Sequence, residues 1–184
     1  GSTSHVTLGV EGSRGTVERF REKFLKEARF IGRLNHPHII HVHEIFEENG
    51  TAYYVMDYAE GGSLADLVKR EGHLSEPEAI RYILQVAEAL AYIHGENMNH
   101  LDVKPANILL NDCNEAVLID FGLSKQYDAL TGGQTSTTPV GISEGYAPME
   151  QYKQGGVSEF SPETDIYALG ATFFMLLTGK TPPG

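Results

Sequence analysis

The sequence predicts an α+β fold, with two strands near its start followed by a mainly helical region. Apolar side chains recur at three- and four-residue spacing over residues 16–34 and 75–95, which is typical of amphipathic helices. Strands are predicted around residues 40–47 and 52–58, joined by a turn signal that contains Asn49-Gly50. The chain of 184 residues, 41% of them apolar, is long enough for one domain with a sizeable core.

The charge balance and the single cysteine narrow the classes of protein to which the chain can belong. With 14 basic and 25 acidic residues the net charge is −11, which disfavours nucleic acid and anionic membrane as partners. Cys113 has no partner for an internal disulfide, so we expect a reducing, cytoplasmic location. The apolar run 166–177 is too short to cross a bilayer, so no membrane-embedded segment is expected.

The first 15 residues are predicted to be a tag remnant and a flexible loop, with at most a weak strand at residues 5–10. The glycines of this stretch, Gly9, Gly12 and Gly15, have the spacing G-x-x-G-x-x-G, which differs from the G-x-G-x-x-G of known phosphate-binding loops. No convincing strand precedes them. A phosphate-binding loop is therefore not predicted here.

Three helices are predicted in the second part of the chain from their caps and periodicity. Ser63 caps a short helix, and Ser75 begins a longer one whose apolar stripe includes His94. Residues 162–177 form a strongly apolar helix, for which Gly179 is the stop signal.

Four histidines cluster before and within the first predicted strand: His36, His38, His41 and His43. The last two would share one face of a strand, as metal ligands can. No carboxylate or cysteine completes a site near them in the sequence, so metal binding is not the preferred interpretation.

One short stretch carries most of the chemistry. Asp102, Lys104 and Asn107 fall within six residues, and Pro105 stiffens the turn between them. Thirteen residues after Asn107 comes Asp120, at the end of an apolar run that reads as a short buried strand. A carboxylate near the attacking hydroxyl, a cation for the transferred phosphate and oxygen ligands for magnesium are the groups that phosphoryl transfer needs.

The motifs H-x-D-x-K-P-x-N-I-L-L, I-D-F-G, G-Y-A-P-M-E and T-D-I-Y-A-L-G follow one another in this order. In these motifs the chain resembles eukaryotic-type (Hanks-type) serine/threonine protein kinases, most closely those of bacteria. The resemblance implies a truncated protein-kinase-like fold. Residues 16–59 would form part of the N-lobe, with one helix, two strands and the hinge, and residues 60–184 the first half of the C-lobe.

The resemblance also implies catalytic roles. Asp102 would orient the substrate hydroxyl and accept its proton, and Lys104 would neutralise charge on the transferred phosphate. Asn107 and Asp120 would ligate the Mg²⁺ that bridges the phosphates of ATP. Lys104 at this position is typical of the Ser/Thr subclass, so the expected partner is a protein substrate with a Ser or Thr acceptor.

Further positions match the family at its nucleotide site and in its supporting structure. Met56 would be the gatekeeper, and the backbone near it would hold adenine. The positions matched to nucleotide binding are Met56, Asp57, Ala59, Leu109 and the ion-pairing Glu27. Those matched to the activation segment and its support are His100, Ser143, Glu150 and Asp165.

The chain also departs from the family pattern. Leu101 replaces the Arg of H-R-D, which usually clamps a phosphorylated activation loop, so control by other means is expected. No Gly-rich loop or lysine strand precedes the helix at 16–34, and no further helices follow residue 177. The chain is therefore interpreted as a fragment of a kinase. The fragment is expected to bind Mg-ATP weakly and to be inactive, whereas its parent is expected to be the enzyme.

Two other classes of protein remain open. A small-molecule phosphotransferase of the aminoglycoside or choline kinase kind shares H-x-D-x-x-x-x-N and a later Asp, but Lys104, G-Y-A-P-M-E and T-D-I-Y-A-L-G count against it. A non-catalytic pseudokinase or binding module is supported only by the missing N-terminal motifs.

The sequence also predicts how the chain would assemble. A ribbon of only two strands is marginal in water, and its unpaired edge can pair with another chain. The apolar helix at 166–177 lacks the later helices that would cover it. Self-association of the chain is therefore expected.

Overall fold

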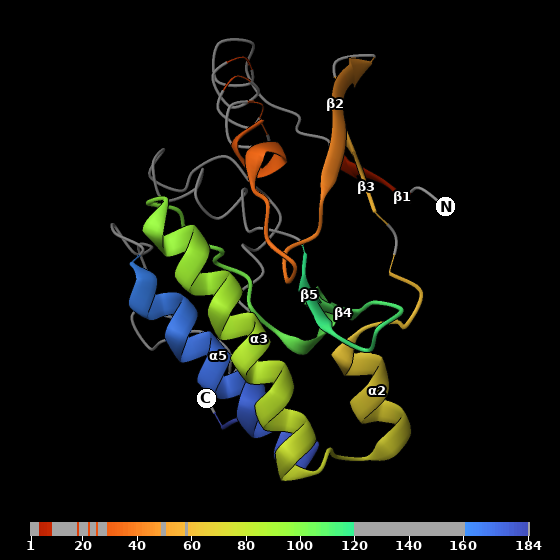
Figure 1. Ribbon diagram of the computed structural model, residues 1–184, viewed down its shortest axis with the longest axis vertical. Coiled ribbons are helices and arrows are strands. Elements are labelled where there is room, and N and C mark those ends of the chain that lie inside the picture. Colours follow the sequence, from red (N-terminus) through yellow and green to blue (C-terminus); the bar gives the residue numbers. More distant parts are fainter. Residues whose placement is uncertain are drawn as a thin grey trace. The chain divides into compact units, whose positions relative to one another are not determined.

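The computed structural model describes residues 4–8, 18, 22, 25, 29–48, 51–57, 59–119 and 161–183 (Figure 1). For residues 4–8 and 51–54 it describes the backbone alone. The chain divides into two compact units, Gly1–Tyr58 and Ala59–Gly184, which are described in turn.

A three-stranded antiparallel sheet forms the first unit. Its strands are β1 (Ser4–Leu8), β2 (Val42–Glu48) and β3 (Thr51–Met56), in the order β1-β3-β2. The prediction of a two-stranded ribbon after a flexible start was wrong, because β1 pairs with β3 from Ser4↔Met56 to Leu8↔Ala52. The pairing satisfies the second edge of β3, a long-range effect that the polar, glycine-rich sequence around β1 does not reveal.

The described residues around this sheet agree with the predicted helix at 16–34. Every residue described between 18 and 33 is helical. Ile31, Leu34 and Ile39 are buried. The pairing of β2 with β3 is irregular between Val42 and Glu44, so that His43 is an extra residue in β2, as in a β-bulge.

The second unit contains the three predicted helices at almost the predicted bounds. They are α2 (Leu64–Glu71), α3 (Glu76–Gly95) and α5 (Pro162–Thr178). Ser63 and Asp66 form a capping box, in which Asp66 N donates to Ser63 Oγ at 3.1 Å and Ser63 N donates to Asp66 Oδ2 at 3.0 Å. The backbone N–H of Ser63, and then its hydroxyl, hold the pKa of the Asp66 carboxyl below its usual value.

Helices α3 and α5 pack side by side and supply the core of this unit (Figure 1). Tyr82, Leu90, Ile93 and Leu176 are fully buried. The far ends of α2 and α5 also meet, where a Cβ placed on Gly179 would lie 2.1 Å from the carbonyl oxygen of Gly72. Only glycine permits this close approach, and at φ 71° Gly179 also ends α5 in the left-handed conformation.

A short hairpin links these helices to the candidate site. The 3₁₀ helix η1 (Pro105–Asn107) runs directly into β4 (Ile108–Leu110), which pairs antiparallel with β5 (Ala116–Leu118). The loop before α2 holds β4, because Gly61 N donates to Leu110 O at 3.1 Å and Leu110 N donates to Gly62 O at 2.9 Å.

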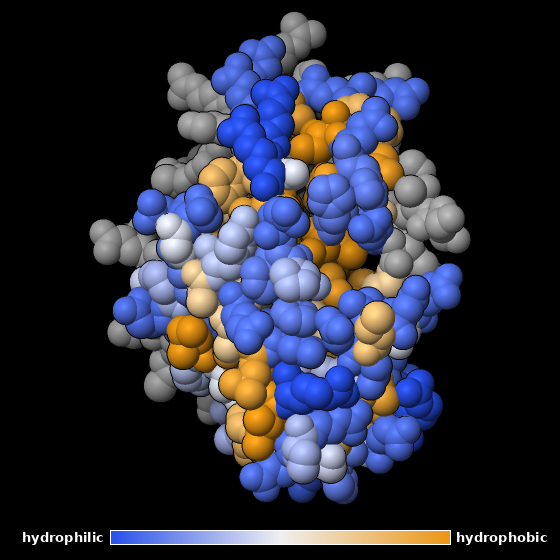
Figure 2. All heavy atoms as spheres, viewed as in Figure 1, coloured by the Kyte–Doolittle hydropathy of each residue, from blue (hydrophilic) through white to orange (hydrophobic). Residues whose placement is uncertain are grey.

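Some apolar side chains of α3 and α5 remain exposed, and hydrophobic surface is visible where these helices lie (Figure 2). Ile80, Leu84, Ile166, Tyr167 and Phe174 are between 38% and 58% exposed. None of the described helices combines the length and the hydropathy needed to cross a bilayer. The third strand replaces the marginal two-stranded ribbon, but β1 and β2 are still the outer strands of the sheet, and self-association stays a prediction.

Candidate active site

A buried carboxylate from α5 holds the loop that follows α3. Asp165 is 1% exposed and accepts hydrogen bonds from two successive backbone amides. His100 N donates to Asp165 Oδ2 and Leu101 N donates to Asp165 Oδ1, both at 2.8 Å. Leu101 has a φ of 68°, a conformation that costs a side chain with a Cβ about 1–2 kcal/mol. The two charge-assisted hydrogen bonds therefore stabilise a strained backbone directly before Asp102.

The same carboxylate also binds a histidine of α3. His94 Nε2 lies 2.8 Å from Asp165 Oδ2, with the His94 side chain only 15% exposed. The ring nitrogen must be the donor, because an ionised carboxylate only accepts. From the sequence, His94 was predicted only as part of the apolar stripe of its helix, and this role was missed. A polar residue within an apolar stripe was the available signal.

His100 connects the loop to the end of β5. Its side chain is fully buried, its Nδ1 lies 3.1 Å from Asp102 N, and its Nε2 lies 2.6 Å from Ile119 O. Because a backbone N–H donates and a carbonyl accepts, these two partners select the neutral tautomer with the proton on Nε2. The ring thereby sets the position of Asp102 relative to β5.

Asp102, Lys104 and Asn107 converge, as their spacing predicted. Asn107 Nδ2 donates to both Asp102 O and Asp102 Oδ2 at 2.8 Å, and Asn107 is 5% exposed. Lys104 Nζ lies 3.7 Å from Asp102 Oδ1. The side chains of Asp102 and Lys104 are 21% and 31% exposed, so a carboxylate and an ammonium face solvent side by side.

The donor atoms here suit a hard cation. Because the Asn107 amide nitrogen donates to Asp102, its oxygen is the atom that could ligate a metal ion, and amide and carboxylate oxygens are the ligands that Mg²⁺ prefers. The four residues Glu27, Asp120, Ser143 and Glu150 lie outside the described residues.

The residues matched to the hinge lie at the end of the first unit and the start of the second. Met56 is buried at the end of β3, and Ala59 is also buried. Asp57 is exposed, and its N donates to His41 O at 3.1 Å. In the second unit, Leu109 is half-buried in β4.

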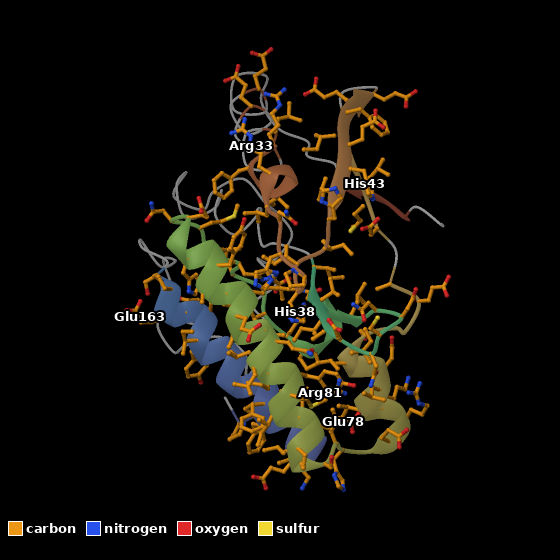
Figure 3. The ribbon with its side chains drawn as sticks, viewed as in Figure 1. Arg33, His38, His43, Glu78, Arg81 and Glu163 are labelled. Atoms are coloured by element: carbon orange, nitrogen blue, oxygen red, sulfur yellow. The ribbon has the colours of Figure 1, made fainter. Side chains whose placement is uncertain are left out.

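A carboxylate lies beside the histidine cluster, contrary to the sequence-based expectation. Asp57 Oδ1 is in hydrogen-bond contact with Nε2 of His43, which projects from β2 (Figure 3). The rings of His41 and His43 meet edge to face, with centroids 4.7 Å apart. The predicted hairpin accounts for the approach of residue 57 to residue 43, and the irregular pairing between Val42 and Glu44 is the part that the sequence did not show. Within the described ranges, no group of three or more His, Cys, Asp or Glu residues could hold a metal ion.

The chain is also similar in sequence to proteins of a known family. A model of the protein kinase domain matches residues 11–184. The chain is 36% identical over 170 residues to serine/threonine-protein kinase B of Synechocystis sp., a match that covers 88% of this chain and 29% of that protein. It is 35% identical over 163 residues to serine/threonine-protein kinase PrkC of Bacillus subtilis, covering 89% and 24%.

A third relative is serine/threonine-protein kinase PknA of Mycobacterium tuberculosis, 36% identical over 168 residues, covering 89% of this chain and 38% of that protein. The chain thus spans about a quarter to two-fifths of the length of these three relatives.

Proposed function

Because the chain belongs to the protein kinase domain family, we propose that the protein that carries it transfers the γ-phosphoryl group of ATP to Ser or Thr hydroxyls of protein substrates. The observation that carries this proposal is the convergence of Asp102, Lys104 and Asn107 on one loop. The names of the three relatives above support Ser and Thr as acceptors.

Asp102 is the residue that acts on the acceptor hydroxyl. Asn107 holds one oxygen of the carboxylate, which fixes its orientation and leaves the group partly exposed to an incoming hydroxyl. The carboxylate accepts the hydrogen bond of that hydroxyl and orients its oxygen toward the γ-phosphorus of ATP. It takes the proton as the new O–P bond forms and the bond from the γ-phosphorus to the bridging oxygen breaks, so that ADP leaves with that oxygen.

Lys104 supplies the positive charge beside the reacting groups. Its ammonium can contact an oxygen of the transferred phosphoryl group while staying near Asp102. Asn107 and Asp120 would hold Mg²⁺, which when bound neutralises charge on the phosphates of ATP.

The residues around the loop keep this arrangement in place. Asp165 holds the backbone of His100 and Leu101, and the His100 ring holds the backbone of Asp102. These residues touch no reacting atom in the proposed mechanism and are positioning residues. A nucleotide-binding role is also proposed for Met56, Asp57, Ala59, Leu109 and Glu27, each because its position in the sequence matches the family.

The proposal is tested by Asp102→Asn in the protein that carries this chain. Phosphoryl transfer from labelled ATP to a Ser- and Thr-containing protein is expected to fall by about 10²–10⁴-fold, the usual contribution of a general base. Glu71→Gln, which changes an exposed carboxylate at the end of α2, is the matched control and keeps its activity. An unchanged rate for Asp102→Asn would contradict the assignment.

The acceptor is identified by analysing the phosphorylated product. Phosphoserine or phosphothreonine is expected after hydrolysis of the labelled protein. Label found only on choline or an aminoglycoside offered in the same assay would instead indicate a small-molecule phosphotransferase. A wild-type protein that transfers no phosphoryl group to any acceptor would indicate a pseudokinase.

A further inference from the structure

The turn between β4 and β5, residues 111–115, is held in one conformation by its own bonds. Asn111 Oδ1 accepts hydrogen bonds from Cys113 N at 3.0 Å and Glu115 N at 2.9 Å. Asn114 has a φ of 57°, and its N donates to Asn111 O at 2.9 Å. The hairpin that this turn closes begins at Ile108, directly after Asn107.

Three side chains of α3 form hydrogen bonds with this turn and with the first residue of β5. One of them, Arg81, is labelled in Figure 3. Arg81 Nη1 donates to Asn114 O at 3.0 Å, and the Tyr82 hydroxyl donates to Asn114 Oδ1 at 3.1 Å. Gln85 Oε1 accepts from Ala116 N, the first amide of β5, at 2.8 Å. Backbone and side-chain atoms of the turn are thus bound from the same helix.

The contact has a buried part at Tyr82 and Ala116 and an exposed part at Arg81. Tyr82 and Ala116 are fully buried. Burial raises the pKa of the Tyr82 hydroxyl further above neutral pH, where a tyrosine hydroxyl is already a hydrogen-bond donor. The Arg81 guanidinium lies 4.6 Å from the centroid of the Tyr82 ring, within range of a cation–π interaction.

The other end of the hairpin adjoins Asn107, one of the proposed magnesium ligands. Ile119 N donates to Asn107 O at 2.9 Å, and Ile108 pairs with Leu118. Asp120 follows Ile119 directly in the chain. Each strand has only three residues, and β5 is buried along its whole length, so a change of register at the turn would move the Asn107 end as well.

We propose that Arg81, Tyr82 and Gln85 are positioning residues that clamp the β4–β5 turn and thereby hold the Asn107–Ile119 backbone hydrogen bond in place, and with it Asn107, one of the proposed ligands of Mg²⁺. The consequence for magnesium rests on the proposed kinase function. The mechanical link from the turn to the Asn107–Ile119 hydrogen bond does not depend on that function. The link and its consequence for magnesium are therefore tested separately.

The mechanical link is tested by amide hydrogen exchange in four variants. Gln85→Leu removes the acceptor for Ala116 N at similar volume, and Tyr82→Phe removes only the hydroxyl. Gln85→Glu keeps an acceptor oxygen, and Leu84→Gln changes a neighbouring side chain that is 58% exposed. Exchange at Ile119 N is expected to be about tenfold faster in the first two variants, and within about twofold of wild type in the last two.

The magnesium consequence is tested by phosphoryl transfer as a function of Mg²⁺ concentration. Gln85→Leu and Tyr82→Phe are expected to raise the half-saturating Mg²⁺ concentration about tenfold, the lower end of what loss of an outer contact costs a metal site. The rate at saturating Mg²⁺ is expected to stay within about threefold of wild type, because no residue that touches substrate is changed.

The two experiments distinguish failure of the clamp from failure of its magnesium consequence and from failure of the proposed kinase function. Unchanged Ile119 exchange in both Gln85→Leu and Tyr82→Phe would overturn the clamp, whatever the activity. Faster exchange with an unchanged magnesium requirement would overturn its catalytic consequence. An inactive wild type would remove the kinase function and with it that consequence, while the exchange rates would still decide whether the clamp exists. If Gln85→Leu does not fold, Tyr82→Phe decides.

Discussion

Asp165 on α5 and His94 on α3 are 71 residues apart in the chain, and their Oδ2 and Nε2 atoms lie 2.8 Å apart in the second unit. The same carboxylate binds the amides of His100 and Leu101. One buried group therefore joins two helices to the loop that carries Asp102, and its removal should affect both stability and the geometry of that loop.

Asp165→Ala is expected to lower the free energy of unfolding by about 3–5 kcal/mol, the usual result of removing one partner from a buried charged network. Urea unfolding followed by circular dichroism measures the change. Glu163→Gln, two residues earlier on the same helix and exposed, is the matched control and should lower the free energy of unfolding far less. Equal losses of unfolding free energy in the two variants would contradict a stabilising role for the buried hydrogen bonds of Asp165.

His94→Leu should cost about 1–3 kcal/mol, because the buried Asp165 oxygen loses a donor. His94→Gln offers an amide N–H in place of the imidazole N–H and should recover part of that loss. Thermal unfolding of the two variants beside wild type gives the comparison. If the leucine variant is the more stable of the two, the hydrogen bond to Asp165 is not what His94 contributes.

Two glycines of the α5 region should respond to alanine in opposite ways. Gly179→Ala adds a Cβ at φ 71° and 2.1 Å from Gly72 O, so a loss of at least about 1–2 kcal/mol is expected. At Gly170, inside α5, a Cβ would meet nothing within 4 Å. Gly170→Ala should therefore stabilise the protein by about 0.5–1 kcal/mol. The pair is compared by urea midpoint, and a stabilising Gly179→Ala would contradict the packing of the two helix ends.

The capping box gives a pH prediction. Asp66 has a lowered pKa because Ser63 donates to its carboxylate, so its contribution to stability is present above the pKa of the unfolded chain and is lost as the pH falls through the folded pKa. Ser63→Ala removes the hydroxyl and should raise the pKa of Asp66 toward its usual value, while losing about 1 kcal/mol of stability as an N-cap. Carboxyl chemical shifts of Asp66 against pH measure the first effect. Ser63→Thr, which keeps a hydroxyl, serves as the control.

Local signals in the sequence predicted the helices closely. Ser63 and Ser75 were identified as caps, and both accept the expected backbone N–H. Helix caps and periodicity depend on residues within one or two turns, so they can be read without knowing the fold. The spacing of Asp102, Lys104 and Asn107 likewise placed these three side chains together, because all of them lie on one tight turn.

The tertiary structure decided the contacts that join distant parts of the chain. It paired β1 with β3, put Asp57 beside His43, and brought His94 to Asp165. The turn signal at Asn49-Gly50 predicted a hairpin and His94 interrupted an apolar stripe, but neither signal named the partner atoms, because these depend on which strand edge or helix face is left to be satisfied once the elements pack. The sequence by itself determined which residues form the Asp102 loop, and only the packing of α3, α5 and the β4–β5 hairpin around that loop decided how its backbone is held.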